Sequence, residues 1–161
     1  MSERTLILLR HAKSDWSDRE ADVDRPLGKR GLRQAHRAGR WLARMFESID
    51  LAVVSPATRA RSTWEVASAE LENPPSVRVD DGIYAASGAR LLAVVRDVPG
   101  DVETVVMVGH NPGFEDLVAL LTGEAASMPT SAFAVIGLAG PWSSAGHSPA
   151  KLRTSGRPPA A

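Results

Sequence analysis

Short apolar runs and longer amphipathic segments alternate along the chain. Apolar residues recur every three or four positions over residues 29–47, which predicts an amphipathic helix. Further helices are predicted over residues 58–71, 87–96 and 112–123. The apolar runs predict strands over residues 5–9, 51–54, 77–79, 105–108 and 132–138. Strands that alternate with helices are typical of an α/β sandwich with a largely parallel sheet.

Residues at the ends of these segments define their limits. Ser87 is expected to cap the third helix, and Pro112 suits the first turn of the fourth. Residues 12–28 are polar without periodicity, which predicts a loop. After residue 140 the chain is rich in Ser, Gly and Pro. There we expect an edge strand over residues 151–153 and a frayed end.

Length and composition place the chain among ordinary globular proteins. Its 161 residues, 43% hydrophobic and 24% charged, suit one domain, with a core over about 4–140 and a polar C-terminal segment 141–161. Without cysteine, disulfides, thiolate metal sites and cysteine nucleophiles are excluded, which fits a cytoplasmic protein. Because no apolar stretch reaches about 18 residues, no membrane span is expected.

The formal net charge of zero conceals an asymmetry between the two halves of the chain. Residues 1–62 contain 13 Lys and Arg against 8 Asp and Glu, and the remainder reverses that balance with 6 against 11. Overall neutrality argues against a nucleic-acid or membrane partner. The excess of arginine in the first half indicates either solvated helix faces or an anion site.

Basic side chains follow three of the predicted strands at the point where each strand ends. The first strand ends in Arg10 and His11, the second is followed by Arg59, and the strand over 105–108 leads to His110. Ligands of open α/β sheets bind at the carboxyl ends of the strands, so these groups are expected to form one cationic pocket. Arginine matches phosphate oxygens bidentately, and histidine can act as nucleophile or proton carrier. The alternative is that the Arg-His pair is a surface feature and that His110 belongs to a turn.

Four segments also resemble motifs of a known family. The chain is similar to the histidine phosphatase superfamily, which includes phosphoglycerate mutases and acid phosphatases, in LRHAKS (9–14), DRPL (24–27), SPATRARST (55–63) and VGHNP (108–112). Most members have Arg-His-Gly where this chain has Arg-His-Ala. The match runs from about residue 5 to 138. The Arg-His-Ala-Lys-Ser motif, the Arg-Pro-Leu loop, the small size and the lack of a lid insertion make it most similar to SixA-type phosphohistidine phosphatases.

The resemblance implies a fold and a set of residue roles. The fold would be a three-layer α/β/α sandwich of the phosphoglycerate mutase-like type, a mostly parallel mixed sheet with one antiparallel strand, forming a single domain over residues 1–161. His11 would be the nucleophile, Arg10 and Arg59 would clamp the phosphoryl oxygens, and His110 would donate to them. Weaker substrate contacts are implied for Ser14, Arg25 and Asn111. No metal or other cofactor is implied, and His36 and His147 are expected to be solvated.

The chain departs from the superfamily where many members carry a general acid. The residue after the second histidine is Asn111, and the Ile-Tyr-Ala frame near residue 83 leaves Asp81 as an acid only if its loop bends. An alkoxide leaving group benefits from an acid, whereas a protonated imidazole needs little help. The departure therefore favours cleavage of a P–N bond.

Three functions follow as hypotheses. The first is hydrolysis of phosphohistidine on a protein, such as a histidine phosphotransfer domain, through a phosphohistidine enzyme intermediate. The second is a phosphomonoesterase that acts on a small phosphoester such as a sugar phosphate. The third is a catalytically inactive module that binds a phosphoprotein. A mutase is disfavoured by the chain length, and a monomer is expected.

Overall fold

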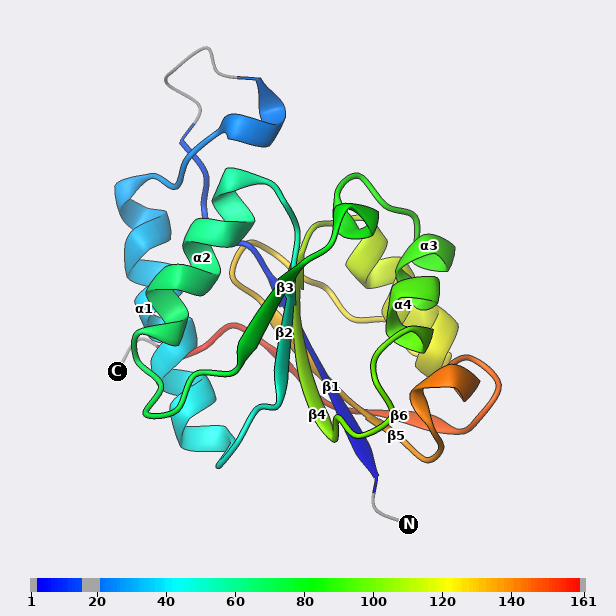
Figure 1. Cartoon of the computed structure of the whole chain (residues 1–161). Helices are drawn as coiled ribbons and strands as arrows, with labels where there is room; N and C mark the ends of the chain where they lie inside the picture. Colours follow the sequence, from blue (N-terminus) through cyan, green and yellow to red (C-terminus); the bar gives the residue numbers. More distant parts are fainter. Residues whose placement is uncertain (1–2, 16–20, 160–161) are drawn as a thin grey trace.

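The computed structural model describes residues 3–15 and 21–159, and within them a six-stranded sheet carries helices on both faces (Figure 1). The strands lie in the order β3-β2-β4-β1-β5-β6. Their bounds are β1 Arg4–Arg10, β2 Leu51–Val54, β3 Ser76–Val79, β4 Thr104–Gly109, β5 Phe133–Leu138 and β6 Ala150–Gly156. β1 pairs in parallel with β4 and in antiparallel with β5, so β5 is the reversed strand of a mostly parallel sheet.

The central strand β1 is buried on both faces. Leu6 and Leu8 belong to one apolar cluster, and Ile7 and Leu9 belong to the cluster on the opposite face. Because successive side chains of a strand point to opposite faces, a strand covered on both sides must be apolar throughout. This is why residues 6–9 form a continuous apolar run rather than an alternating one.

Two pairs of helices cover the sheet, one pair on each face (Figure 1). The pair α1 (Lys29–Met45) and α2 (Thr58–Ser68) packs over one face, and α3 (Gly88–Arg96) and α4 (Gly113–Thr122) pack over the other. The Ser87 side chain accepts a hydrogen bond from the Arg90 backbone N–H at 3.2 Å, which confirms the predicted cap of α3. α4 begins one residue after Pro112.

The polar C-terminal segment contributes more to the fold than its composition indicates. Trp142, in the short 3₁₀ turn Trp142–Ser144, is buried in the α3–α4 cluster, and its indole N–H donates to the Val102 carbonyl at 2.7 Å. β6 is seven residues long and pairs along the whole of β5. The expected core limit near residue 140 therefore excluded a core residue, and the edge strand is longer than 151–153.

The fold class and the order of elements are confirmed. In the polar segment 12–28 the described residues contain the 3₁₀ turn Asp22–Asp24 and an isolated bridge between Ser14 and Leu27. The part of that predicted loop over 16–20, and the last two residues of the end expected to fray, lie outside the described residues. Among the described helices, none is both long and apolar enough to cross a membrane.

The close approach of α1 and α2 generates a prediction. A Cβ added at Gly39 would lie 2.2 Å from the Ala67 carbonyl oxygen, so Gly39→Ala forces the two helices apart. We expect it to lower the free energy of unfolding by about 1–2 kcal/mol, because overpacking outweighs the gain of about 1 kcal/mol in helix propensity. Urea denaturation measures this.

The matched control is Gly100→Ala, since a Cβ there meets no atom within 4 Å. This variant should unfold at the same urea concentration as the unaltered protein. An equally or more stable Gly39→Ala protein would contradict the helix contact.

Candidate active site

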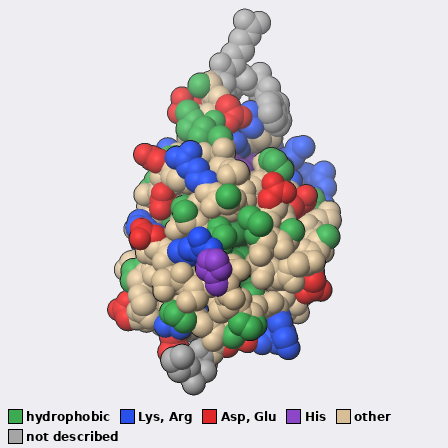
Figure 2. Space-filling view, turned by 90° about the vertical axis from the view of Figure 1, so that its right-hand side faces the viewer, with side chains coloured by type: hydrophobic (Ala, Val, Ile, Leu, Met, Phe, Trp, Pro, Cys, Tyr) green, Lys and Arg blue, Asp and Glu red, His purple; other side chains and the backbone are tan. Residues whose placement is uncertain are grey.

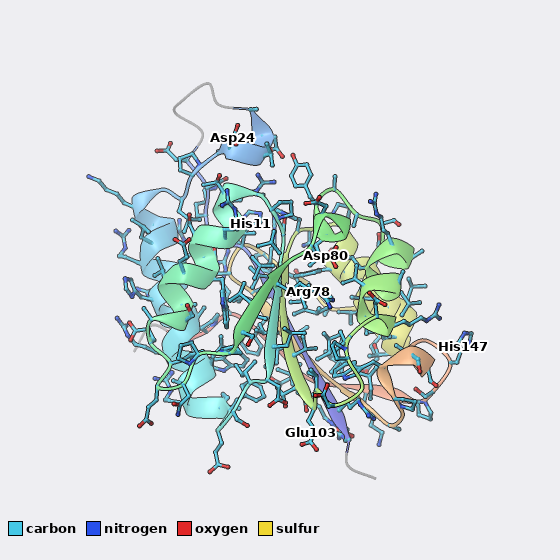
Figure 3. All side chains as sticks on the ribbon, in the orientation of Figure 1. His11, Asp24, Arg78, Asp80, Glu103 and His147 are labelled. Carbon is cyan, nitrogen blue, oxygen red and sulfur yellow. The ribbon has the colours of Figure 1, made fainter. Side chains whose placement is uncertain are left out.

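The carboxyl ends of β1, β2 and β4 meet at one edge of the sheet and deliver polar residues to a single pocket. His11 lies at this edge, whereas His147 lies away from it beside the turn after β5 (Figure 3). The pocket has a volume of about 280 Å³. It is lined by Arg10, His11, Lys13, Ser14, Arg25, Arg59, His110, Asn111 and Thr130. All seven residues predicted for the site thus lie around one cavity.

Backbone hydrogen bonds fix the position of His11 beyond the end of β1. Its N–H donates to the Gly109 carbonyl at the end of β4, and its carbonyl accepts from the Ser131 N–H, both at 3.0 Å. The neighbouring strand β4 and the segment before β5 therefore hold His11 from two sides.

Side chains of α2 and α1 form hydrogen bonds with the backbone of the next two residues, Ala12 and Lys13. The Ala12 N–H donates to the Thr63 hydroxyl of α2 at 3.0 Å, and the Lys13 N–H donates to the Gln34 side-chain oxygen of α1 at 2.9 Å. The Thr63 hydroxyl in turn donates to the Arg59 carbonyl at 2.6 Å. The His11 segment and Arg59 thus share a buried side chain that sets their relative position.

The His11 ring is a neutral imidazole with a defined tautomer. Its Nδ1 lies 2.8 Å from the Ala12 carbonyl oxygen, and since a carbonyl can only accept, Nδ1 carries the proton. Nε2 is therefore left with its lone pair and accepts a long hydrogen bond from Arg59 Nε at 3.4 Å. Burial, aided by the charges of Arg59, Arg10 and Arg25, lowers the pKa of His11 to about 4 although the Ala12 contact opposes this. The result is an uncharged nitrogen base surrounded by guanidinium groups.

Asp22 is the counter-ion of two arginines that line the pocket. Arg59 donates to the Asp22 carbonyl at 2.7 Å and to its carboxylate at 3.2 Å, and Arg25 forms an ion pair with the same carboxylate at 2.9 Å. The Tyr84 hydroxyl donates to it at 2.5 Å. This hydrogen bond lowers the pKa of Asp22, and the charges of Arg59 and Arg25 lower it further. The same hydrogen bond raises the pKa of Tyr84, although the two arginines oppose that shift.

His110 faces His11 from the end of β4. The ring centroids of the two histidines are 5.2 Å apart, and His110 Nε2 lies 2.7 Å from the Ser55 hydroxyl oxygen. Burial and the neighbouring His11 lower the pKa of His110 to about 3. Its Nδ1 is buried without a hydrogen-bond partner among the described residues.

The Arg10 guanidinium has one hydrogen-bonded nitrogen and one nitrogen without a partner among the described residues. One of its terminal nitrogens donates to the Met128 carbonyl at 3.0 Å, while its Nε is buried without a partner among the described residues. Burial lowers the pKa of Arg10. A buried unpaired donor costs about 1–3 kcal/mol, so Arg10 Nε is poised for an acceptor brought by a ligand. His110 Nδ1 is a second such donor in the tautomer in which the Ser55 hydroxyl donates to Nε2.

The three residues predicted as weaker substrate contacts differ in their surroundings. The Ser14 hydroxyl accepts from Arg25 Nε at 3.1 Å, so these two act as a pair. The Asn111 side-chain N–H₂ already donates to Glu115 at 2.9 Å and to the Met128 carbonyl at 2.7 Å. Asn111 therefore lines the pocket but uses its amide to fix the loop around Met128.

Sequence reasoning assigned no role to several residues that shape the site. Asp22 pairs with Arg25 and Arg59, and Tyr84 donates to Asp22. Thr63 and Gln34 bind the backbone that follows His11 from the helices. Asp81, which was considered as a general acid, does not line the pocket. Outside the pocket, His36 and His147 are exposed as expected, and the His36 ring lies 3.0 Å from the Glu70 carboxylate. In the described part of the chain, no three His, Asp or Glu side chains form a group able to hold a metal ion.

Known proteins match the chain in sequence and in structure. The family model of the histidine phosphatase superfamily (branch 1) matches residues 6–84. An uncharacterized protein of Mycobacterium tuberculosis is 36% identical over 145 residues, which cover 83% of this chain and 89% of the relative. The structure of a candidate phosphohistidine phosphatase SixA from Nakamurella multipartitia has a TM-score of 0.84 at 30% identity and covers 98% of both chains. The protein histidine phosphatase SixA complexed with tungstate has a TM-score of 0.83 at 25% identity and covers 96% of this chain and 97% of its own.

The depressed pKa of His11 gives the first prediction for this site. We expect ¹⁵N-correlated NMR spectra to show neutral His11 and His110 rings at pH 5.5, with the His11 proton on Nδ1. The variant His36→Gln/His147→Gln leaves these two as the remaining histidines and simplifies the assignment. Because the unfolded chain takes up protons first, the stability should also fall as the pH is lowered from about 6.5 toward 4. A midpoint near pH 6.5 for either ring would contradict the buried neutral pair.

The contacts of Asp22 give the second prediction for this site. Asp22→Asn removes a negative charge from beside Arg25 and Arg59 and should tighten the binding of inorganic phosphate by about fivefold, equal to about 1 kcal/mol. Calorimetric titration with phosphate measures this. The control is Asp24→Asn, because Asp24 is likewise exposed but, unlike Asp22, forms no ion pair with a described residue. Equal effects of the two substitutions would show that the Asp22 contacts do not matter.

Proposed function

The chain belongs to the histidine phosphatase superfamily and is of its SixA type, and from its site we propose that it hydrolyses phosphohistidine on a protein substrate. The observation that carries the proposal is the buried, neutral His11 ring, whose unprotonated Nε2 lies among Arg10, Arg25 and Arg59. The similarity to SixA structures supports the same reading of the substrate class.

In the first step the lone pair of His11 Nε2 forms a bond to phosphorus. The P–N bond of the substrate breaks at the same time, and its electron pair remains on the leaving imidazole. His11 gains positive charge as the bond forms, and the Ala12 carbonyl, which accepts the Nδ1 proton's hydrogen bond, stabilises that charge. In the second step water displaces His11 from phosphorus, releasing phosphate and a proton.

The arginines and His110 would stabilise the transferring phosphoryl group. Charge accumulates on its equatorial oxygens in the transition state, and donors placed beforehand at those oxygens lower the barrier. The unpartnered Arg10 Nε supplies one such donor, and Arg59 supplies another beside the attacking nitrogen. His110 Nδ1 would supply a third in the tautomer in which the Ser55 hydroxyl donates to Nε2. An incoming phosphoryl group would also relieve the cost of leaving these buried donors unpaired.

The state of Asp22 supports P–N rather than P–O cleavage. An alkoxide leaving group needs a proton, but the Tyr84 hydroxyl and the two arginines keep the pKa of Asp22 below its ordinary value. Asp22 is therefore ionised near neutral pH and has no proton to give. A phosphohistidine imidazole that is already protonated at its other nitrogen leaves as a neutral ring, so it needs no such acid.

The test compares hydrolysis of a phosphohistidine peptide with hydrolysis of a panel of phosphoesters that includes sugar phosphates. We expect the peptide to have the higher kcat/KM and His11→Ala to abolish both its turnover and the labelled phosphoenzyme. Faster ester hydrolysis by orders of magnitude would favour the phosphomonoesterase. Unchanged activity in His11→Ala would refute His11 as the nucleophile.

Two arginines two residues apart in one motif, Arg59 and Arg61, provide a matched comparison. Arg59 is buried beside His11, whereas Arg61 is exposed and donates to the Pro56 carbonyl. Arg59→Ala should lower kcat/KM by about 10²–10³-fold, the usual cost of removing one transition-state donor, while Arg61→Ala should leave it nearly unchanged. Similar losses in both variants would place the wrong arginine at the phosphoryl group.

A further inference from the structure

A second pocket, of about 240 Å³, lies beside the candidate active site and is rich in arginine. It is lined by Arg30, Arg33, Gln34, Arg37, Ser131, Arg157 and Pro158. We refer to it as the arginine pocket. Three of its arginines lie on one face of α1, because residues three and four apart on a helix are neighbours. The fourth comes from the chain just after β6.

The arginine pocket shares its wall with the active site. Gln34 and Ser131, which line it, are the residues that hold the Lys13 N–H and the His11 carbonyl. Arg157 donates to the Thr130 carbonyl at 3.0 Å and to its hydroxyl at 3.3 Å, and Thr130 lines the catalytic pocket. The charge of Arg157 also contributes to lowering the pKa of Arg10. The two pockets are therefore separated by a single layer of residues.

The positive charge of this pocket is not neutralised within the described residues. Arg40, one turn beyond Arg37 on α1, lies 3.7 Å from the Glu70 carboxylate, but Arg30, Arg33 and Arg37 form no ion pair with any described residue. The first turn of α1 contains no acidic residue and instead carries Lys29 and Arg30. Basic groups at a helix N-terminus oppose the helix dipole, so this arrangement costs stability that a bound anion would restore.

The opposite side of the molecule lacks such a concentration of one charge. On the face formed by α3, α4 and the turn after β5, Lys and Arg side chains alternate with Asp and Glu (Figure 2). A mixture of positive and negative side chains is the ordinary condition of a solvated surface. The arginine pocket differs, because its charged side chains are all positive and it adjoins the catalytic cavity.

We propose that the arginine pocket binds the carboxylates of an acidic segment that flanks the phosphohistidine of a protein substrate. This deepens the proposed function and rests on it for the identity of the substrate. Residues 30 to 37 extend roughly 10 Å along the helix, a length that suits several carboxylates on a peptide better than one small anion. Such contacts would position the substrate and speed its encounter without taking part in the chemistry.

A binding experiment tests the pocket without relying on catalysis. A fluorescein-labelled, Glu-rich peptide that carries no phosphate is titrated with the full chain, and anisotropy reports its Kd. We expect Arg33→Glu/Arg37→Glu to weaken binding at least tenfold and Arg33→Gln/Arg37→Gln to weaken it less. The control is Arg90→Glu/Lys151→Glu, which makes the same change in net charge at exposed residues of α3 and β6. Far-UV circular dichroism verifies that each variant is folded.

Kinetics then separate substrate docking from chemistry. For a phosphohistidine peptide with an acidic flank, Arg33→Glu/Arg37→Glu should raise KM at least tenfold, while the turnover of free phosphohistidine stays unchanged. An equal loss on both substrates would overturn the docking role, because the pocket would then affect the active site itself.

The binding results also separate this inference from the proposed function. Equal losses in the two charge-reversal variants, or no loss in either, would overturn the arginine pocket as a binding site. Displacement of the peptide by inorganic phosphate at submillimolar concentration would show a site for a single small anion instead. Selective loss of peptide binding in a protein that hydrolyses no phosphohistidine would support the pocket while refuting the proposed substrate.

Discussion

The hydrogen bond between His11 Nδ1 and the Ala12 carbonyl is the interaction on which the site depends. It assigns the ring proton to the nitrogen that faces the backbone and leaves Nε2 with its lone pair toward Arg59. The bond is local, but the carbonyl that receives it is fixed by distant parts of the fold. The Thr63 hydroxyl accepts a hydrogen bond from the Ala12 N–H, and the Gln34 side chain accepts one from the Lys13 N–H. Two helices on one face of the sheet therefore determine the orientation of the His11 ring. A change in helix packing is therefore transmitted to His11 Nε2, the nitrogen that we propose as the nucleophile.

Electrostatics at this edge of the sheet reconcile two opposing requirements. Phosphate binding needs positive charge, whereas nucleophilic attack needs a histidine that is not protonated. The arginines meet both, because the same charges that attract a phosphoryl group contribute with burial to lowering the pKa of His11 and His110. Asp22 neutralises part of this field where Arg25 and Arg59 converge. Since its side chain is half exposed, an incoming phosphoryl group can replace it without removing a buried partner.

The sequence predicts the part of the site that follows from topology. Arg10, His11 and His110 come directly after apolar strands, and parallel strands bring their carboxyl ends to one edge of a sheet, so periodicity alone is enough to group them. Asp22 could not be found this way, because it is one of several acidic residues in a segment without periodicity. Thr63 ends one of the motifs shared with the superfamily, but nothing in the sequence shows that its hydroxyl, or the Gln34 side chain, binds the backbone that follows His11. Their roles depend on which helix face approaches the His11 segment, and that is decided by tertiary packing.

The C-terminal segment has the composition of a loop, yet β6 completes the sheet beside the reversed strand β5. The chain beyond β6 brings Arg157 to Thr130, which lines the candidate active site. An edge strand that pairs along its whole length is held by backbone hydrogen bonds, which do not depend on side-chain type. Its outward side chains are therefore free of packing demands. Polar and basic residues can accumulate there at little cost to the fold, so the charge that surrounds the catalytic pocket can differ between relatives that share the same sheet.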